Sequence, residues 1–218
     1  MECLYCGRRC RRAGRQKKGA QRFYCAICEK YQQSSYRYKA CSASTSRQIK
    51  ALVRESVGVR GIARILGIAR QTVLKRTVLI AKTISRPVDK LDQPSFEVDE
   101  LWTYLNRKDN EYWVAYAIDR RTRSVVDFVV GKRTKATLKE LIDRLLRLNP
   151  KVIRTDKLTL YEYLIPKRLH RRGATLINRI ERKNLSIRTH LKRLSRRTIC
   201  FSRSLTMLES CLRIYFSG

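Results

Sequence analysis

The apolar residues between positions 46 and 86 recur at the spacing of amphipathic helices. Within this stretch, "GVRGIARILGIARQTVLKR" predicts a helix over Ile62–Leu66, a turn at Gly67 and a second helix from about Ala69. Two helices joined by a short glycine turn are typical of a helix-turn-helix. The apolar positions that define these helices are Ile49, Leu52, Val53, Ile62, Ile65, Leu66, Val73, Leu79 and Ile80.

From position 95 the pattern changes to the alternation of strands. Three alternating segments, 95–106, 111–119 and 124–131, are separated by the polar turns "RKDN" and "RRTR", which predicts an antiparallel meander. Next come a predicted helix over 134–148, a short buried strand "KVIRTD" and a helix over about 177–194. Three antiparallel strands, a crossing helix and a parallel strand form the mixed sheet of a ribonuclease H-like topology.

Two cysteine pairs, Cys3-x2-Cys6 and Cys25-x2-Cys28, stand 18 residues apart near the start of the chain. Paired thiolates at this spacing are typical of tetrahedral Zn²⁺, with each pair on a tight knuckle. Four thiolates close the coordination shell, so this zinc is expected to hold the module together and not to catalyse. Of the other cysteines, Cys10 and Cys41 are expected to be buried or free thiols, with a role as substitute zinc ligands as the alternative.

The stretch 85–94, "SRPVDKLDQP", contains two prolines and interrupts both patterns. We therefore expect an α+β chain of several domains with a linker at 87–94. The expected domains are a zinc-binding ribbon at 1–45, a helix-turn-helix at 46–86 and a ribonuclease H-like α/β catalytic domain at 95–218.

The net charge of the chain indicates what kind of molecule it binds. The 218 residues include 50 Lys or Arg and 18 Asp or Glu, which gives a formal net charge of +32. Such an excess indicates double-stranded DNA or another nucleic acid, with an anionic membrane as the weaker alternative. No stretch approaches 18 apolar residues, and "MECLYCGRRC" contains no apolar signal segment. We expect a cytoplasmic protein that associates with the nucleoid and has no membrane partner.

The basic second helix of the 46–86 segment favours DNA binding over a helical hairpin of some other use. Such a helix would enter the major groove. The side chains it would offer there are Arg70, Gln71, Thr72, Lys75 and Arg76.

The most informative acid is Glu181, which lies in the basic segment "NRIERKN". A carboxylate within a phosphate-binding surface is expected where a metal ion must be held beside a phosphate. In the predicted topology Asp99 lies in the first strand, and Asp156 ends the parallel strand beside it. Three carboxylates from these elements could converge, and hard oxygen ligands are those that Mg²⁺ or Mn²⁺ takes.

Other acids compete for this role. By strand alternation Glu97 shares a face with Asp99 and is the main rival ligand, whereas Glu100 is expected to neutralise a neighbouring base. Capping the start of a helix is the alternative role for Asp156. We expect Asp119 to cap a turn, and Asp127 and Asp143 to form surface ion pairs.

Three segments carry a family resemblance: "VDELWTY" around Asp99, "RTDKLTLYEYLIP" around Asp156 and "INRIERKNLSIRTHLKRLSRRTICFSRS" around Glu181. They resemble transposases of the bacterial insertion-sequence-one family, whose short spacing matches the 24 residues between Asp156 and Glu181. The cysteine pairs and the helix-turn-helix resemble that family's terminal-repeat-binding region, so the resemblance covers nearly the whole chain.

The resemblance implies a DDE transposase in which Asp99, Asp156 and Glu181 hold the catalytic Mg²⁺ or Mn²⁺. It implies recognition of the element's inverted repeats by residues 1–86, cleavage of 3′ ends, strand transfer into target DNA and assembly on DNA as a homo-oligomer. In many members of the family, ribosomal frameshifting joins two halves of the enzyme. Here the two halves form one continuous chain, so we expect the full fusion enzyme.

Basic residues near Glu181 extend this hypothesis. Asn184 and Arg188 follow Glu181 at i+3 and i+7 on one helical face. We expect Arg188 to contact the scissile phosphate and Asn184 to orient Glu181, with a solvated helix face as the alternative. Flanking phosphates are expected to be bound, without reading of sequence, by Lys192, Arg193, Arg196 and Arg197.

Two other functions compete with the enzyme. One is a non-catalytic DNA-binding repressor of an insertion element that acts through residues 1–86. The other is an RNA-binding zinc-ribbon protein, which leaves the carboxylate pattern unexplained.

Overall fold

The structure is a computed structural model, and it describes residues 1–34, 38, 42–85, 93–195 and 202–217. The chain forms two compact units, Met1–Thr45 and Ser46–Gly218. Among the positions singled out above, Cys41, Arg196 and Arg197 lie outside the described residues, as does most of the expected linker.

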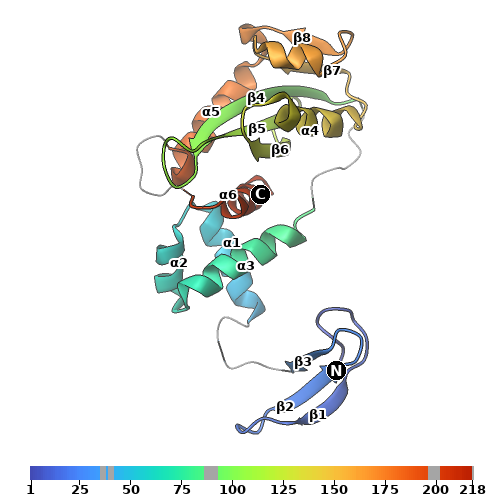
Figure 1. Ribbon diagram of the computed structural model, residues 1–218, viewed down its shortest axis with the longest axis vertical. Helices are drawn as coiled ribbons and strands as arrows, with labels where there is room; N and C mark the ends of the chain where they lie inside the picture. Colours follow the sequence, from blue (N-terminus) through green and yellow to red (C-terminus); the bar gives the residue numbers. More distant parts are fainter. Residues whose placement is uncertain (35–37, 39–41, 86–92, 196–201, 218) are drawn as a thin grey trace. The chain divides into compact units, whose positions relative to one another are not determined.

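The first unit is built on a three-stranded antiparallel sheet in the order β1-β2-β3 (Figure 1). A bridge between Glu2 and Arg9 closes the loop before β1. Phe23 packs against the buried thiols Cys3, Cys10 and Cys25, so the thiols themselves form the small core. The strands are β1 (Arg11–Arg15), β2 (Gln21–Cys25) and β3 (Lys30–Gln33).

The second unit begins with helices, as the apolar spacing predicts. Gly67 ends α2 in the left-handed conformation at φ 63°, and its N–H caps the carbonyls of Ala63 and Arg64. Two of the apolar positions that define the helical pattern, Ile65 and Leu79, are 62% and 55% exposed and so do not contribute to the core. The helices are α1 (Ala43–Arg54), α2 (Val59–Leu66) and α3 (Arg70–Thr83).

A five-stranded mixed sheet follows, in the order β6-β5-β4-β7-β8. The first three strands pair antiparallel as predicted, and β7 pairs parallel to β4. The fifth strand, β8, pairs parallel to β7 and was not predicted. The strands are β4 (Ser95–Tyr104), β5 (Glu111–Asp119), β6 (Val125–Gly131), β7 (Val152–Thr155) and β8 (His170–Arg172).

Helices cover both faces of this sheet. On one face α4 (Lys135–Leu146) packs its leucines on Phe96 and Val98 of β4. On the other face, α5 (Asn178–His190) and α6 (Leu205–Phe216) pack around Tyr116 of β5. The expected helix over about 177–194 divides into α5 and the 3-10 turn η4 (Lys192–Leu194). Alternate residues of β4 therefore face different helices.

Helix α6 was not predicted, and it joins the helical and sheet parts of the second unit. It lies between the sheet and helices α1–α3 (Figure 1), where it packs against α3 and β6. A further link is a 3.0 Å hydrogen bond from the backbone N–H of Lys192 to Ser56 Oγ. Helix α3 is thus packed against α6.

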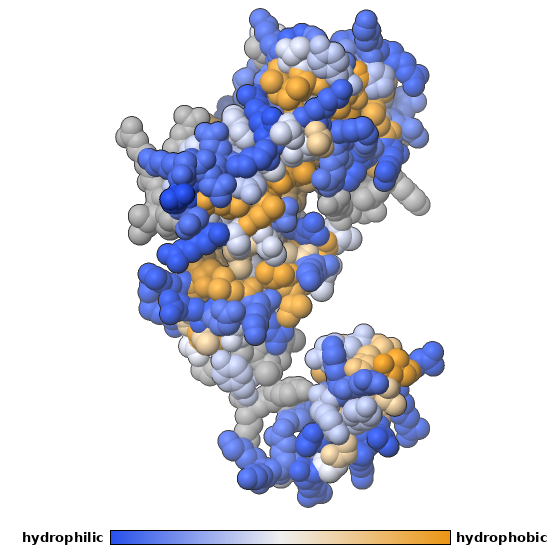
Figure 2. Space-filling model, in the orientation of Figure 1, coloured by the Kyte–Doolittle hydropathy of each residue, from blue (hydrophilic) through white to orange (hydrophobic). Residues whose placement is uncertain are grey.

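The surface is largely hydrophilic, as expected for a chain with so many charged residues. Hydrophilic residues cover most of the face drawn in Figure 2. Within the described parts of the chain, no helix has the length and apolar character needed to cross a bilayer.

Candidate active site

The carboxylates of Asp99 and Asp156 meet at one edge of strand β4. The parallel register pairs Glu97 with Arg154, and β7 ends at Thr155. Continued by two residues, this register sets Asp156 beside Asp99. Carboxylate oxygens of both residues, together with one from Glu100, lie within 4.8 Å of one another. The parallel pairing of two strands distant in sequence therefore builds an acidic cluster.

Glu100 joins this cluster although strand alternation puts it on the opposite face from Asp99. Its side chain is buried beside α4, where Tyr161 Oη donates to Oε1 at 2.5 Å and Arg133 pairs with Oε2 at 2.9 Å. The expectation that Glu100 neutralises a neighbouring base is confirmed. Its place in the cluster was not expected: β7 ends before this point, so the edge of β4 is open to side chains from both faces.

The environment of Asp99 opposes its negative charge. Burial raises its pKa to about 6, against hydrogen bonds from the Glu100 N–H and the Asn184 amide that lower it. The charges of Glu100 and Asp156 contribute to this rise. Oδ1 accepts from the Glu100 N–H at 2.8 Å and Oδ2 accepts from Asn184 Nδ2 at 2.6 Å. A cation placed among these carboxylates would relieve the repulsion.

Asp156 is held by the turn that follows β7. Its Oδ1 accepts from the backbone N–H of Leu158 at 2.9 Å, at the entrance to the 3-10 helix η2 (Thr159–Tyr163). Asp156 thus holds the turn before η2 but does not cap this helix, whose N-cap residue is Leu158 without a side-chain cap, so the alternative capping role is wrong. Next to it, the hydroxyl of Thr155 lies 2.8 Å from His170 Nε2. His170, at the start of β8, therefore contacts the residue that precedes Asp156.

Glu97, the rival ligand, has a structural role. It is fully buried, Oε1 pairs with Arg120 at 2.7 Å, and Oε2 accepts from the backbone N–H of Ile180 at 3.0 Å. It therefore ties the start of β4 to the first turn of α5. Glu97 lies outside the cluster of described acids, and its expected role as main rival is wrong.

Glu181 lies on the first turn of α5 and is exposed. Of the described acids, those within 4.8 Å of one another at this site are Asp99, Glu100 and Asp156, and Glu181 is outside that set. It shares a helix face with Asn184, three residues later. The amide of Asn184 contacts Asp99, and its expected contact with Glu181 stays a prediction.

The basic residues after Glu181 pack around the C-terminal end of α5. Arg188 donates to the carbonyl of Leu194 at 3.3 Å, and Arg193 donates to Ser202 Oγ at 2.8 Å. Lys192 is exposed. Their expected contacts with phosphate stay predictions.

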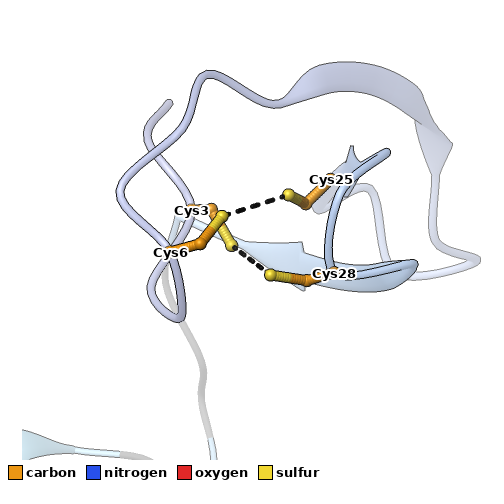
Figure 3. Close-up of side chains that lie close together, drawn as sticks. All are labelled: Cys3, Cys6, Cys25 and Cys28. Carbon is orange, nitrogen blue, oxygen red and sulfur yellow. Dashed lines mark hydrogen bonds between the residues drawn. The ribbon is translucent and has the colours of Figure 1, made fainter.

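The four paired cysteines form a second cluster in the first unit (Figure 3). Their sulfurs lie within 4.8 Å of one another, with Cys3 3.9 Å from Cys28 and Cys6 3.6 Å from Cys25. Burial raises the pKa of Cys3, but hydrogen bonds from the Tyr5 N–H and from Gln32 help to lower it to about 6. The hydrogen bond with Cys6, together with burial, raises the pKa of Cys28 to about 12, so the thiols of this cluster do not all ionise without a cation.

Cys10 packs with Cys3 and Cys25 in the small core but lies outside the set of four sulfurs that are within 4.8 Å of one another. It is buried, and its sulfur accepts from Gln32 Nε2 at 3.1 Å.

Helix α3, the second helix of the predicted helix-turn-helix, exposes several side chains of its N-terminal half. Arg70, Gln71 and Lys75 are exposed, and Thr72 is half-buried. Arg76 is also half-buried and donates to Ser46 Oγ at 3.4 Å. Three of the five expected base-reading side chains are therefore fully accessible.

Asp119 and Asp143 are paired as predicted, whereas Asp127 forms the predicted ion pair but is buried, not at the surface. Asp119 caps the turn after β5 by accepting from the N–H groups of Arg121 and Thr122. Asp127 pairs with Arg144, and Asp143 pairs with Lys139.

Comparison with known proteins adds a family. The family model described as IS1 transposase matches residues 95–217, more than half of the chain. The insertion element iso-IS1n protein InsB of Shigella dysenteriae is 38% identical over 116 residues, which are 53% of this chain and 88% of that protein. The insertion element IS1 protein InsB of Shigella flexneri is 39% identical over 121 residues, 56% of this chain and 92% of that protein. An insertion element IS1 2 protein InsB of Escherichia coli K12 is 37% identical over 121 residues, 56% of this chain and 72% of that protein.

Proposed function

Because the chain belongs to the IS1 transposase family, we propose that it binds the terminal inverted repeats of an insertion element and catalyses metal-dependent cleavage and strand transfer at its 3′ ends. The catalytic part would be the ribonuclease H-like domain expected from position 95. The observation that carries this proposal is the cluster of Asp99, Glu100 and Asp156 in the segment that matches the family.

The donor set of this cluster fits a divalent cation. It consists of carboxylate oxygens within 4.8 Å of one another, and the pKa of Asp99 is raised because burial and like charges disfavour its ionised form. Mg²⁺ and Mn²⁺ prefer such oxygen ligands and neutralise their charge. When bound, the cation would activate a hydroxyl nucleophile and stabilise the leaving oxygen of an in-line displacement. Water would serve in cleavage and a 3′-hydroxyl in strand transfer.

The cluster contains two of the proposed metal ligands, Asp99 and Asp156, and the third ligand has still to be assigned. We assign it to Glu181, since it lies on α5 one turn before Asn184, which contacts Asp99. Glu100 is the alternative, favoured by its place in the cluster. Against Glu100, its charge is already neutralised by the cation Arg133, whereas the partners of Asp99 are uncharged.

The segment before the family match would hold the DNA. We propose that Cys3, Cys6, Cys25 and Cys28 bind a structural Zn²⁺, which their sulfur cluster fits, and that this folds a zinc ribbon. Helix α3 would then read the inverted repeat in the major groove through its exposed side chains. Phosphates nearer the site would contact Arg188, Lys192 and Arg193.

Binding of the two element ends requires more than one copy of the chain, so we propose a homo-oligomer on DNA. The proposal is tested by incubating purified protein with end DNA and Mg²⁺ or Mn²⁺, and mapping the products. Nicks at the 3′ ends and joined strands are expected. Specific end binding without either product would instead indicate a non-catalytic repressor.

A further inference from the structure

A chain of three polar side chains connects the carboxylate cluster to the inside of the domain. Tyr116 Oη donates to Asn184 Oδ1 at 2.6 Å, and Asn184 Nδ2 donates to Asp99 Oδ2 at 2.6 Å. Asp99 and Tyr116 are direct cross-strand partners in β4 and β5, and Asn184 lies across from them on α5. All three therefore meet between the sheet and α5.

The hydrogen bonds between these three side chains fix which group donates and which accepts. An ionised carboxylate solely accepts hydrogen bonds, so Asn184 must turn its NH₂ towards Asp99 and its oxygen towards Tyr116. Tyr116 is fully buried, and burial together with the nearby charge of Asp99 raises the pKa of its hydroxyl, so it remains a donor. The tyrosine thus fixes the orientation of the amide, and the amide fixes that of the carboxylate.

We propose that Asn184 and Tyr116 are positioning residues, which hold Asp99 in the orientation that binds the catalytic cation. This inference rests on the proposed function, because it takes Asp99 to be a metal ligand. The bonds from Asn184 and from the Glu100 N–H engage one lone pair on each oxygen of Asp99. Each oxygen keeps its other lone pair for a cation. Outer partners of this kind orient metal ligands and raise metal affinity.

The tyrosine is itself held by the C-terminal helix. Its ring stacks on Phe216 of α6 with centroids 6.0 Å apart and planes inclined by 16°, and Phe216 contacts Phe128 of β6 at 5.4 Å. Tyr116 Oη also lies 3.3 Å from the carbonyl of Ile180. These contacts leave the hydroxyl little freedom to move away from Asn184.

The test measures metal binding without DNA. Mn²⁺ is titrated into the full chain while the melting temperature of the second unit is followed, since a cation that binds the folded form raises it. The variants are Tyr116→Phe, Asn184→Leu, their combination and Asp99→Asn. Asn178→Leu is the matched control, because it makes the same change at an exposed position of the same helix. Tyr116→Phe keeps the ring and its stacking, so its fold is preserved.

We expect the half-saturating Mn²⁺ concentration to rise about 10-fold in Asn184→Leu and about 3-fold in Tyr116→Phe. The combined variant should match Asn184→Leu alone, because Tyr116 acts through Asn184. The control should bind like the wild type and Asp99→Asn should not respond. The inference is overturned if Tyr116→Phe and Asn184→Leu both bind Mn²⁺ within 2-fold of the wild type while Asp99→Asn does not respond. A wild-type response in Asp99→Asn would instead overturn the proposed metal site and this inference with it.

Discussion

The carboxylates of Asp99 and Asp156 lie within 4.8 Å of each other, although β5, β6 and α4 separate their strands in the sequence. The parallel pairing of β4 with β7 produces this proximity, since β7 ends where the edge of β4 presents Asp99. Asn184 then joins the pair to α5. The site is therefore built from elements that are assembled only when the whole sheet has formed.

The raised pKa of Asp99 predicts that its charge destabilises the metal-free protein. Burial raises this pKa from 3.8 to about 6, so the folded state favours the neutral carboxyl group. Below pH 3.8 the carboxyl group is neutral and does not reduce the free energy of unfolding. The reduction grows as the pH rises to about 6 and is constant above that. Relative to Asp99→Asn, the free energy of unfolding of the wild type should fall by about 1 to 3 kcal/mol across this range.

Urea denaturation of both proteins in EDTA at several pH values checks this prediction. The variant serves as the reference, so that the titration of all other groups cancels. A difference between the two proteins that does not change between pH 4 and pH 7 would show that Asp99 is not destabilised by its surroundings.

The choice between Glu181 and Glu100 as third ligand predicts opposite effects of two isosteric changes. Glu181→Gln should reduce strand cleavage more than about 100-fold and leave the stability unchanged, because the residue is exposed. Glu100→Gln should keep cleavage within about 10-fold of the wild type. It should lower the free energy of unfolding by about 1 to 2 kcal/mol, because Arg133 loses its charged partner. Cleavage rates and urea melts of the two variants measure this, and the reverse order of activities would make Glu100 the ligand.

Much of the sheet could be predicted because its residues alternate cleanly and polar turns separate the strands. The same alternation places Glu97 and Asp99 on one face, and they do both face α5. Alternation could not show that Glu97 is paired with Arg120 and hydrogen-bonded by the Ile180 N–H. Nor could it show that the end of β7 brings Glu100 into the cluster. These facts depend on where neighbouring strands stop.

Two elements were missed for different reasons. Strand β8 has three polar residues, "HRR", and no alternation, so only its pairing with β7 defines it. Helix α6 carries a helical apolar pattern at Leu205, Leu208 and Leu212 that was available in the sequence. Asn184 was placed on the correct face of its helix, but its partner could not be known before α5 was packed on β4.

The thiol cluster predicts a structural zinc ion in the first unit. Cys25→Ser should lose the bound zinc and abolish binding to end DNA, since a four-ligand site does not tolerate the loss of a thiolate. Cys10→Ser is the matched control, because Cys10 is buried nearby but stays outside the cluster. Metal analysis and DNA-binding isotherms provide the measurement. Equal zinc content and binding in Cys25→Ser and the wild type would refute the site.

The exposed residues of α3 predict a contribution to DNA affinity that depends on salt. Arg70→Ala and Lys75→Ala should each weaken binding. If each contacts one phosphate, each should reduce the log–log slope of affinity against salt concentration by about 0.9. Lys139→Ala removes an exposed lysine of α4 and is the control. A slope unchanged in both α3 variants would place the phosphate contacts elsewhere.

The most direct test of the central claim is single-turnover cleavage of end DNA with Mg²⁺ by four proteins: the wild type, Asp99→Asn, Asp156→Asn and Asp109→Asn. Asp109 is an exposed acid paired with Arg107, so its variant controls for the loss of one carboxylate. We predict that the wild type and Asp109→Asn cleave at similar rates, whereas Asp99→Asn and Asp156→Asn bind the DNA but do not cleave it. Cleavage at the wild-type rate by either of the last two variants would contradict the account.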